Sequence, residues 1–239
     1  MANIRSVLSG PWSVIGNPSG MAGLTTISVG LSYENYFQLP ELGMASFSCG
    51  IPTKSGIFGL GYHSFGFSGL RQNQASLAYG RALGKWLRAG IGLHWLTVAQ
   101  PAGYTDLFAI LPSIGIQLIP LENVQVGITL INPAQQDFRP SGYKEIPLSF
   151  LAGIGYRMGR EAWVCFETEK RNGEHPRYTA GIEVDLLETI RFRFGIAPSR
   201  GSIFSFGLGY RYKRISVDAS VVYCPVPGYR TALGLTYTF

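Results

Sequence analysis

The sequence predicts an all-β protein, a transmembrane antiparallel β-barrel of about 14 strands with a short N-terminal hatch. Charged residues make up 14% of the 239 residues, where soluble domains have roughly 25%, and glycine accounts for 31 of them. The longest apolar stretch, residues 107–121, is interrupted by Pro112 and Pro120, whereas a spanning helix needs about 20 mostly apolar residues. An apolar chain without a spanning helix points to a closed barrel.

Apolar residues recur at every second position along most of the chain. In residues 177–186 the even positions are apolar, from Tyr178 to Leu186, and the odd positions are charged, polar or glycine. A period of two with one apolar face indicates a β-strand. The segments repeat at roughly 15 residues, which matches spanning strands of about 9–11 residues joined by short connections. The expected strand cores are 25–36, 43–52, 56–65, 73–82, 86–97, 107–119, 123–132, 146–157, 161–171, 176–186, 189–197, 203–213, 215–224 and 230–239.

The connections between these segments alternate between tight turns and longer links. Tight turns are expected at 54–56, 83–85, 159–160 and 187–188, and longer links at 67–72, 99–106 and 133–146. Outer-membrane barrels have short turns on the periplasmic side and longer loops outside. The sequence therefore predicts a protein of the bacterial outer membrane with both termini in the periplasm.

A soluble β-sandwich is the alternative architecture, because its strands also alternate. The solvated face of a sandwich is rich in Lys, Glu and Thr, whereas the polar face here is rich in Gly, Ser and Arg. Aromatic residues also recur near the expected strand ends, for example Tyr33, Trp86, Trp163 and Tyr210, as in the interfacial girdles of membrane barrels. Both features favour the barrel.

The two ends of the chain differ in character and divide it into a hatch, residues 1–23, and a barrel, residues 24–239. The first ten residues have no apolar core of the kind found in a signal peptide, so we expect the numbering to begin at the mature chain. The last strand ends with Tyr237 and Phe239 in phase with its apolar face. A terminal aromatic on an edge strand resembles the signal that outer-membrane assembly machinery recognises, because an exposed edge pairs readily with another sheet.

The turn-rich segment Asn17-Pro18-Ser19-Gly20-Met21-Ala22 resembles the Asn-Pro-Ala-Gly-Leu-Ala motif in the hatch of FadL-like outer-membrane barrels. Other segments are similar to the PorV/PorQ-like branch of these barrels, namely 52–61, 79–84, 132–133 and 233–239. The resemblance covers nearly the whole chain. It implies that Trp12 to Gly23, which contains the hatch motif Asn17, Pro18, Ser19 and Gly20, folds into the barrel mouth or lumen from the periplasmic side, with Asn17 bonding to inward-facing backbone.

This resemblance supports two hypotheses for function. PorV-like proteins act in type IX secretion, which implies a non-enzymatic scaffold or accessory subunit of a multiprotein outer-membrane secretion or assembly machine. Its partners would be lipid, lipopolysaccharide and other outer-membrane proteins. Short loops and a short hatch favour this role, since long loops shape a substrate groove. The alternative is a FadL-like transporter that passes hydrophobic small molecules through a lateral opening, for which a kink at Pro112 is a candidate; a local bulge without a transport role is equally compatible with that proline.

Motifs for catalysis and cofactor binding are sparse. The sequence has no nucleophile elbow, zincin motif, Walker loop or dinucleotide fingerprint, so we predict neither an enzyme nor a bound cofactor. His63 and His94 are in phase with inward-facing glycines and are interpreted as hydrogen-bonded lumen residues. Cys49, Cys165 and Cys224 lie too far apart to indicate a metal site or a disulfide framework. The net charge of +6 is scattered, which argues against a nucleic-acid partner.

Glycine pairs lie inside several expected strands, at 59/61, 90/92, 153/155 and 207/209. Because they are within strands and do not precede helices, they do not indicate phosphate loops. We interpret them as sites of close packing against an interior plug or of strong strand curvature.

Charged residues fall on the inner face of the expected barrel, and folding each hairpin about its turn predicts which of them meet. The expected facing pairs are Glu169 with Arg177, Asp185 with Arg191, Glu183 with Arg193, and Arg211 with Asp218. Opposite charges at facing positions stabilise a sheet by about 0.2–1 kcal/mol per pair. We expect these pairs to occlude the lumen; the alternative is that they only line water.

Overall fold

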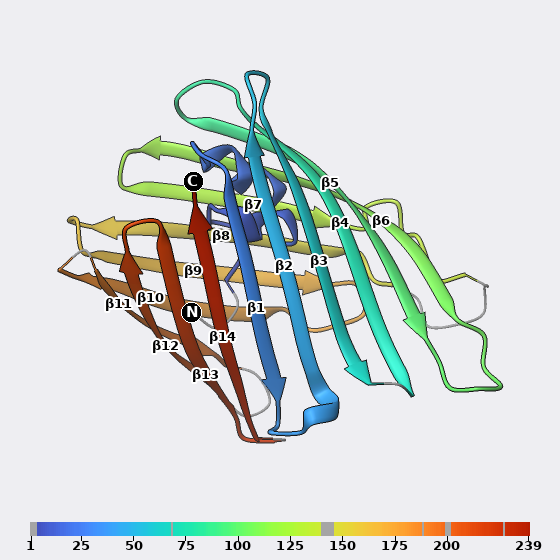
Figure 1. Ribbon diagram of the computed structural model, residues 1–239. Coiled ribbons are helices and arrows are strands. Elements are labelled where there is room, and N and C mark those ends of the chain that lie inside the picture. Colours follow the sequence, from blue (N-terminus) through green and yellow to red (C-terminus); the bar gives the residue numbers. More distant parts are fainter. Residues whose placement is uncertain (1–3, 68, 140–145, 188, 199–201, 227) are drawn as a thin grey trace.

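The computed structural model describes residues 4–67, 69–139, 146–187, 189–198, 202–226 and 228–239, and it forms a closed antiparallel β-barrel (Figure 1). Fourteen strands follow one another around the barrel in chain order, and β1 closes it against β14, which confirms the expected architecture. The strands are β1 (Ser28–Tyr36), β2 (Gly43–Pro52), β3 (Ile57–Phe67), β4 (Leu70–Ala82), β5 (Leu87–Ala99), β6 (Leu107–Leu121), β7 (Val124–Ile131), β8 (Ser149–Met158), β9 (Ala162–Arg171), β10 (Arg177–Leu186), β11 (Ile190–Ala197), β12 (Ile203–Tyr212), β13 (Ile215–Cys224) and β14 (Gly228–Thr238).

Helical structure in the described residues is limited to three short 3-10 segments, η1 (Pro11–Val14), η2 (Pro18–Gly23) and η3 (Pro40–Leu42). Within this part of the chain no helix has the length and apolar character needed to cross a membrane. The even-to-odd connections, such as β2–β3 and β4–β5, are tight turns that gather at one end of the barrel, which we call the turn end. The odd-to-even connections lie at the opposite loop end, and the chain finishes at the turn end (Figure 1).

One expectation about an individual segment is wrong. The link expected at 67–72 is short, because β3 continues to Phe67 and β4 begins at Leu70. The β5–β6 ladder has no bulge at Pro112, because Pro112 pairs in register with Leu93 and the irregularity of β6 lies between Leu118 and Leu121. Pro112 lies one residue beyond the last pair of β6 with β7, so its missing N–H removes no ladder bond.

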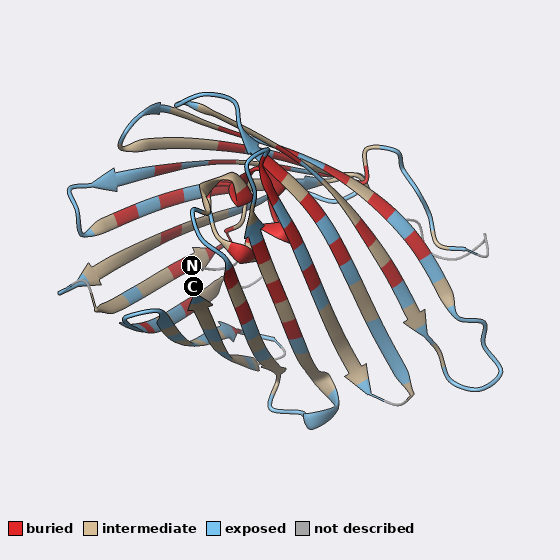
Figure 2. Cartoon of the chain, turned by 45° about the horizontal axis from the view of Figure 1, so that its top comes forward, coloured by how far each residue is buried: buried red, intermediate tan, exposed pale blue. Residues whose placement is uncertain are grey.

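The outer face of the barrel is a belt of exposed apolar side chains. Buried and exposed residues alternate along the strands (Figure 2), and the outward residues Leu31, Ile91 and Leu233 are 53%, 62% and 63% exposed. A continuous apolar surface of this extent is unfavourable in water but matches the hydrocarbon layer that surrounds a membrane barrel. The period of two thus separates a lipid-facing surface from the lumen.

Residues 4–23 form a plug that lies inside the barrel and packs on glycines of its inner face. Each of the eight consecutive strands β1–β8 has at least one glycine that lies very close to the plug or to the adjoining Leu24. A Cβ added to any of these glycines would come within 3.0 Å of an atom there. They are Gly30, Gly50, Gly59, Gly61, Gly80, Gly90, Gly115, Gly127 and Gly153. At Gly115 this Cβ would lie 1.9 Å from Asn17 Oδ1. Glycine is therefore required for the close approach of the plug, and we call these residues the glycine track.

The glycine pairs of the sequence divide between two roles. Gly59, Gly61, Gly90 and Gly153 belong to the glycine track, as expected for packing against a plug. Gly92 and Gly155 face Ser113 and Trp163 of neighbouring strands, and the pair at 207/209 faces Arg193 and Asp218 on β11 and β13, the strands beside it. The plug therefore lies against β1–β8 and leaves the wall of β10–β13 to other contacts.

A buried carboxylate holds the start of the plug. Glu167 on β9 is 4% exposed, and its Oε2 accepts hydrogen bonds from the backbone N–H of Arg5 at 2.9 Å and of Ser6 at 2.6 Å. The neighbouring Glu169 accepts from Arg5 Nη2 at 3.3 Å. Hydrogen bonds to a charged acceptor contribute about 1.5–3 kcal/mol each, so Glu167 is the strongest polar anchor of the plug.

We expect Gly115→Ala to destabilise the protein by about 1–3 kcal/mol, because the new methyl group overlaps Asn17 and forces the plug or β6 to shift. Thermal unfolding of the purified barrel, followed by the heat-dependent change in its gel mobility, measures the effect. The matched control is Gly234→Ala on β14, where the nearest atom to the added Cβ lies at 3.9 Å. Equal unfolding midpoints for the two variants would contradict the glycine track.

We expect Glu167→Ala to release the start of the plug, because two buried backbone N–H groups lose their acceptor. Trypsin cleavage after Arg5, followed by mass spectrometry of the intact barrel, reports this release. Glu161→Ala is the control, since Glu161 is exposed in the β8–β9 turn. Equal resistance of wild type and Glu167→Ala to cleavage at Arg5 would show that the carboxylate is not the anchor.

Candidate functional site in the lumen

The hatch motif lies deep within the plug. Asn17 is the N-cap of η2, and its Oδ1 accepts from Ser19 N at 3.1 Å and from Ser19 Oγ at 2.7 Å. Its Nδ2 donates to Ser6 O at 2.6 Å, whereas the carbonyl of Ile116 in the barrel wall lies at 3.5 Å. Asn17 therefore ties the plug to itself, and the expected bond to inward-facing barrel backbone is only a long contact.

The other motif residues complete a compact turn. Pro18 occupies the first helical position of η2, where its missing N–H costs nothing. Gly20 packs so closely on the preceding segment that an added Cβ would lie 2.4 Å from Leu8 O. Pro18, Ser19 and Gly20 are all buried.

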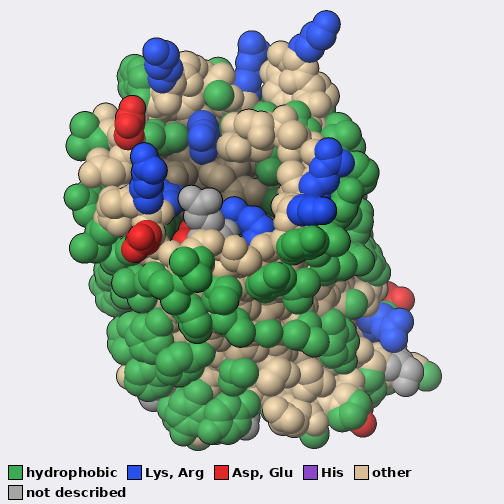
Figure 3. Space-filling view, turned by 60° about the vertical axis from the view of Figure 1, so that its left-hand side comes forward, with side chains coloured by type: hydrophobic (Ala, Val, Ile, Leu, Met, Phe, Trp, Pro, Cys, Tyr) green, Lys and Arg blue, Asp and Glu red, His purple; other side chains and the backbone are tan. Residues whose placement is uncertain are grey.

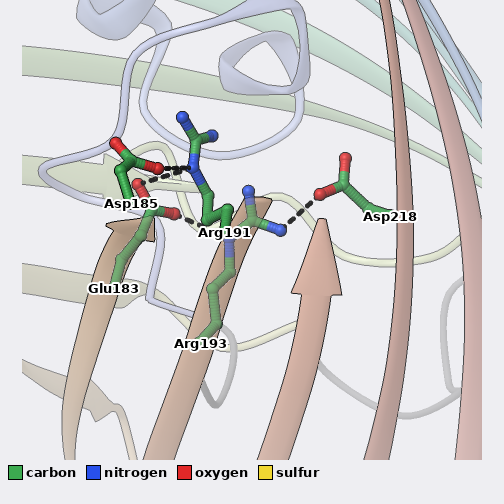
Figure 4. Close-up of polar contacts among 5 residues, drawn as sticks. All are labelled: Glu183, Asp185, Arg191, Arg193 and Asp218. Carbon is green, nitrogen blue, oxygen red and sulfur yellow. Dashed lines mark hydrogen bonds and ion pairs between the residues drawn. The ribbon is translucent and has the colours of Figure 1, made fainter. Parts of the chain in front are cut away.

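A network of ion pairs covers the inner face of β10–β13, and we call it the charged wall. Asp185 meets Arg191 at 2.5 Å, Glu183 meets Arg193 at 2.6 Å, and both pairs are register partners across the β10–β11 hairpin. Arg191 also approaches Glu183 at 3.4 Å, and Arg193 reaches Asp218 on β13 at 2.5 Å. Figure 4 shows these five side chains as one connected chain of contacts. The expected pairs about the 187–188 turn are present, although Glu188 itself lies outside the described residues.

Two expected ion pairs have different partners. Glu169 faces Arg177 in the β9–β10 register, but its carboxylate binds Arg171 at 2.9 Å and Arg5 at 3.3 Å. Arg211 faces Ser216, and Asp218 faces Gly209, so Arg211 and Asp218 are not opposite each other.

The cause of the second error is the length of the β12–β13 turn. Tyr212 pairs directly with Ile215, which leaves only Lys213 and Arg214 as turn residues, and Lys213 has a positive φ of 52°. A register that places Arg211 opposite Asp218 would leave four residues, 213–216, between the paired strands, two more than the actual turn has. Asp218 is thereby free to bind Arg193 instead of Arg211.

The lumen is not filled by these pairs, contrary to the expected occlusion. The pairs lie side by side on one wall, and a cavity of about 850 Å³ separates that wall from plug residues 8–16. We call this cavity the plug-side passage. It reaches the turn end at Lys213 and Arg214, where Figure 3 shows a hollow with Lys and Arg side chains around its rim.

A second cavity of about 470 Å³, the loop-end pocket, lies on the loop side of the plug. Apolar side chains such as Met44, Leu111 and Ile131 share its lining with charged ones such as Glu34 and Arg230. Arg230 Nη1 lies 3.5 Å from Glu34 Oε1, which places an ion pair at the edge of an otherwise mixed pocket. The volume is in the range of ligand pockets, about 300–1,000 Å³.

The outer surface carries a third hollow, the outer groove, of about 880 Å³ over β10–β14 and β1. Outward apolar side chains such as Ile182, Phe206 and Leu233 line it. Ser220 and Ala232 line both this groove and the loop-end pocket, and they are register partners on β13 and β14. One layer of sheet therefore separates the pocket from the lipid-facing surface at this point.

His94 forms a buried hydrogen-bonded group that the sequence pattern did not resolve. Its Nδ1 lies 2.8 Å from Ser76 Oγ and 3.3 Å from Gln74 Nε2, and its Nε2 lies 2.9 Å from Ser113 Oγ. His94 is 2% exposed and Ser113 is 1% exposed. A Ser–His contact at this distance has the geometry of a nucleophile and its base, but burial keeps substrate from the serine oxygen. The group fits the interpretation of His94 as a hydrogen-bonded lumen residue.

The remaining candidate residues are the two aromatic residues at the end of the last strand and the three cysteines, and their contacts are structural. The rings of Tyr237 and Phe239 meet edge to face with centroids 4.8 Å apart, and Phe239 N donates to Ile27 O at 2.9 Å, so the chain end is tied to the strand that closes the barrel. Their role as an assembly signal stays a prediction. Cys49, Cys165 and Cys224 are free thiols, and in the described part of the chain no three His, Cys, Asp or Glu residues gather as metal ligands.

Glu167 and Arg5 are the functional side chains that sequence reasoning missed. The alternating pattern placed Glu167 on the inner face, which is the only local signal available. Its partners are backbone N–H groups more than 160 residues away, and Arg5 lies in a segment without strand periodicity.

Comparisons with known proteins identify the fold of the chain but not its family or its function. No family model matches the sequence, and no curated protein matches it. Among solved structures, the Pseudomonas putida toluene transporter TodX superposes with a TM-score of 0.75 at 10% identity, covering 98% of this chain and 95% of TodX. The Ralstonia pickettii toluene transporter TbuX gives 0.74 at 10% identity, covering 100% and 96%.

A Pseudomonas aeruginosa FadL homologue gives a TM-score of 0.69 at 10% identity, covering 98% of this chain and 95% of its own. Of these neighbours, TodX and TbuX are described as toluene transporters. At this level of identity the likeness extends to the fold alone. The chain thus has the closed 14-strand barrel fold of TodX, TbuX and the FadL homologue along almost its whole length.

Proposed function

We propose that this chain is an outer-membrane barrel that passes small apolar molecules from the loop-end pocket, through the barrel wall, into the lipid. The observation that carries the proposal is the Ser220–Ala232 pair, which lines the loop-end pocket on one side and the outer groove on the other. The full-length fold likeness to two toluene transporters supports it.

The lining of the two ends of the lumen favours a lateral route. The barrel side of the plug-side passage carries charged side chains, among them Arg191, Glu183 and Lys213, whereas plug residues such as Leu8 and Ile15 line its other side. The outer groove is walled by apolar side chains, and transfer of apolar surface out of water is favourable by about 25 cal/mol per Å². An apolar molecule in the loop-end pocket therefore has its lowest free energy on the lipid side of β13 and β14.

Small residues make this part of the wall thin. Ser220 and Ala232 present little side chain to the pocket, and Gly207 on the neighbouring strand also lines the groove. The β13–β14 ladder is continuous from Ile215 to Cys224 in this structure. Passage then requires local separation of these two strands, since every backbone group in the bilayer must otherwise stay paired.

The scaffold role in a secretion machine, and the PorV/PorQ-like branch that suggested it, have no support in the fold comparisons or in the lumen geometry. We propose transport in its place. The periplasmic position of the turn end and of both termini follows from the short turns of outer-membrane barrels and remains part of this proposal.

We expect a disulfide between β13 and β14 to stop transport. The double variant Ser220→Cys/Ala232→Cys places thiols on register partners, whose separation in an antiparallel ladder suits a disulfide. The measurement is uptake of radiolabelled toluene by cells that lack their own transporter and express the barrel. Oxidised cells should fall to the uptake of cells without the barrel and recover after treatment with dithiothreitol.

The control places the same bond elsewhere in the wall, as Gln72→Cys/Val98→Cys on β4 and β5. This variant should transport as the wild type does under both conditions. Full uptake by the oxidised Ser220→Cys/Ala232→Cys variant, with the disulfide verified by gel mobility, would rule out an exit between β13 and β14.

A further inference from the structure

The charged wall leaves an excess of positive charge beside the plug. Its ion pairs join three carboxylates to Arg191 and Arg193. Arg211, Lys213 and Arg214 continue the same surface to the turn end, and in the described part of the chain no carboxylate lies within 4.0 Å of their charged nitrogens. These three cations are therefore not neutralised by the network beside them.

The plug-side passage as a whole is cationic. Six basic side chains line it, from Arg5, Arg191, Arg193, Arg211, Lys213 and Arg214. They outnumber the four carboxylates that line it or pair with them, from Glu183, Asp218, Asp185 and Glu169. Its remaining barrel-side lining includes small polar or glycine positions such as Ser32, Ser46 and Gly234. A cleft with one sign of charge and low-dielectric walls concentrates ions of the opposite sign.

The passage and the loop-end pocket adjoin each other. Arg5, Ile15, Met44 and His63 line both cavities. Arg5 is the fixed cation at this junction, because its backbone N–H is held by Glu167 and its Nη2 lies 3.3 Å from Glu169. Among the described residues, Nε of Arg5 and Nε of Arg230 have no hydrogen-bond partner, and both atoms are buried. The two arginine side chains line the cavities and add positive charge there.

We propose that the barrel conducts small hydrated anions, such as chloride, through the plug-side passage and past Arg5 to the loop-end pocket. The anion route and the lateral route share the loop-end pocket, but they leave it in different directions, past Arg5 and between β13 and β14, so they are separate activities. Attraction between an anion and the cations of the wall is stronger where water is limited, because the effective dielectric constant is lower there. A cation passing the same wall meets repulsion of the same origin.

Planar-bilayer recording of the purified full-length barrel across a potassium chloride gradient tests the proposal. We expect a steady conductance whose reversal potential shows preference for chloride over potassium. The triple variant Arg211→Gln/Lys213→Gln/Arg214→Gln should lose most of this preference. The control variant Lys54→Gln/Lys85→Gln/Arg160→Gln removes the same charge from turns that do not line the passage, and it should keep the wild-type reversal potential.

Chemical labelling locates the path independently of selectivity. Gly234 lines the passage, and the nearest atom to an added Cβ lies at 3.9 Å, so Gly234→Cys introduces a thiol without crowding. A negatively charged methanethiosulfonate should reduce the conductance of Gly234→Cys and leave unchanged that of wild type and of Ser55→Cys in the β2–β3 turn.

Three results would overturn the proposal: no conductance from barrels whose heat-dependent gel mobility shows them to be folded, a preference for potassium, or a reversal potential that the Arg211, Lys213 and Arg214 substitutions do not shift. None of these results depends on toluene uptake, so the lateral route for apolar molecules stands or falls separately.

Discussion

Close contact between the plug and the glycine track determines how the inside of this barrel is organised. A closed barrel is the solution that a membrane imposes on a β-sheet, because each backbone N–H and C=O needs a partner within the wall. Closure leaves a lumen that side chains or a plug must fill. Here at least one glycine on each of the strands β1–β8 removes a side chain from the wall, and atoms of the plug or of the adjoining Leu24 take its place.

The lumen is asymmetric as a consequence. A plug that contacts β1–β8 stands away from β10–β13, where the inner face keeps its full-length charged side chains. Those side chains pair with each other along the wall and do not reach the plug, so a passage remains between them. On the loop side of the plug the lining becomes mixed, and at Ser220 and Ala232 the wall thins toward an apolar outer groove. Polar and apolar routes are thus separated by the position of one segment.

Local sequence patterns predicted the barrel and a part of the charged wall. The period of two gave the strands to within three residues, since a slip of one residue would turn charged side chains toward lipid. Asp185–Arg191 and Glu183–Arg193 were predictable because both lie across one tight hairpin. Arg211 was misplaced because its expected pairing with Asp218 needs a β12–β13 turn of four residues, whereas the turn contains two, Lys213 and Arg214, with a positive φ at Lys213.

Long-range contacts could not be predicted in this way. Glu169 forms ion pairs with Arg5 and Arg171 and not with its register partner Arg177. Glu167 accepts hydrogen bonds from backbone N–H groups of the plug. Both sets of contacts depend on where the plug lies, and no periodic pattern in residues 1–23 specifies that position. The hatch motif indicated a compact turn at Asn17, but it did not indicate that Asn17 would pack against Gly115 of the barrel wall. The cavities follow from the same unpredicted placement.

Hydrogen exchange of individual plug amides, measured by NMR on the detergent-solubilised barrel, tests the central claim most directly. The N–H groups of Arg5 and Ser6, bound to Glu167, and of Gly20, bound to Asn17 O, should exchange as slowly as amides in the middle of the strands. Exchange of these three amides at the rate of an unstructured peptide, with the strand amides still protected, would contradict a plug held inside the barrel.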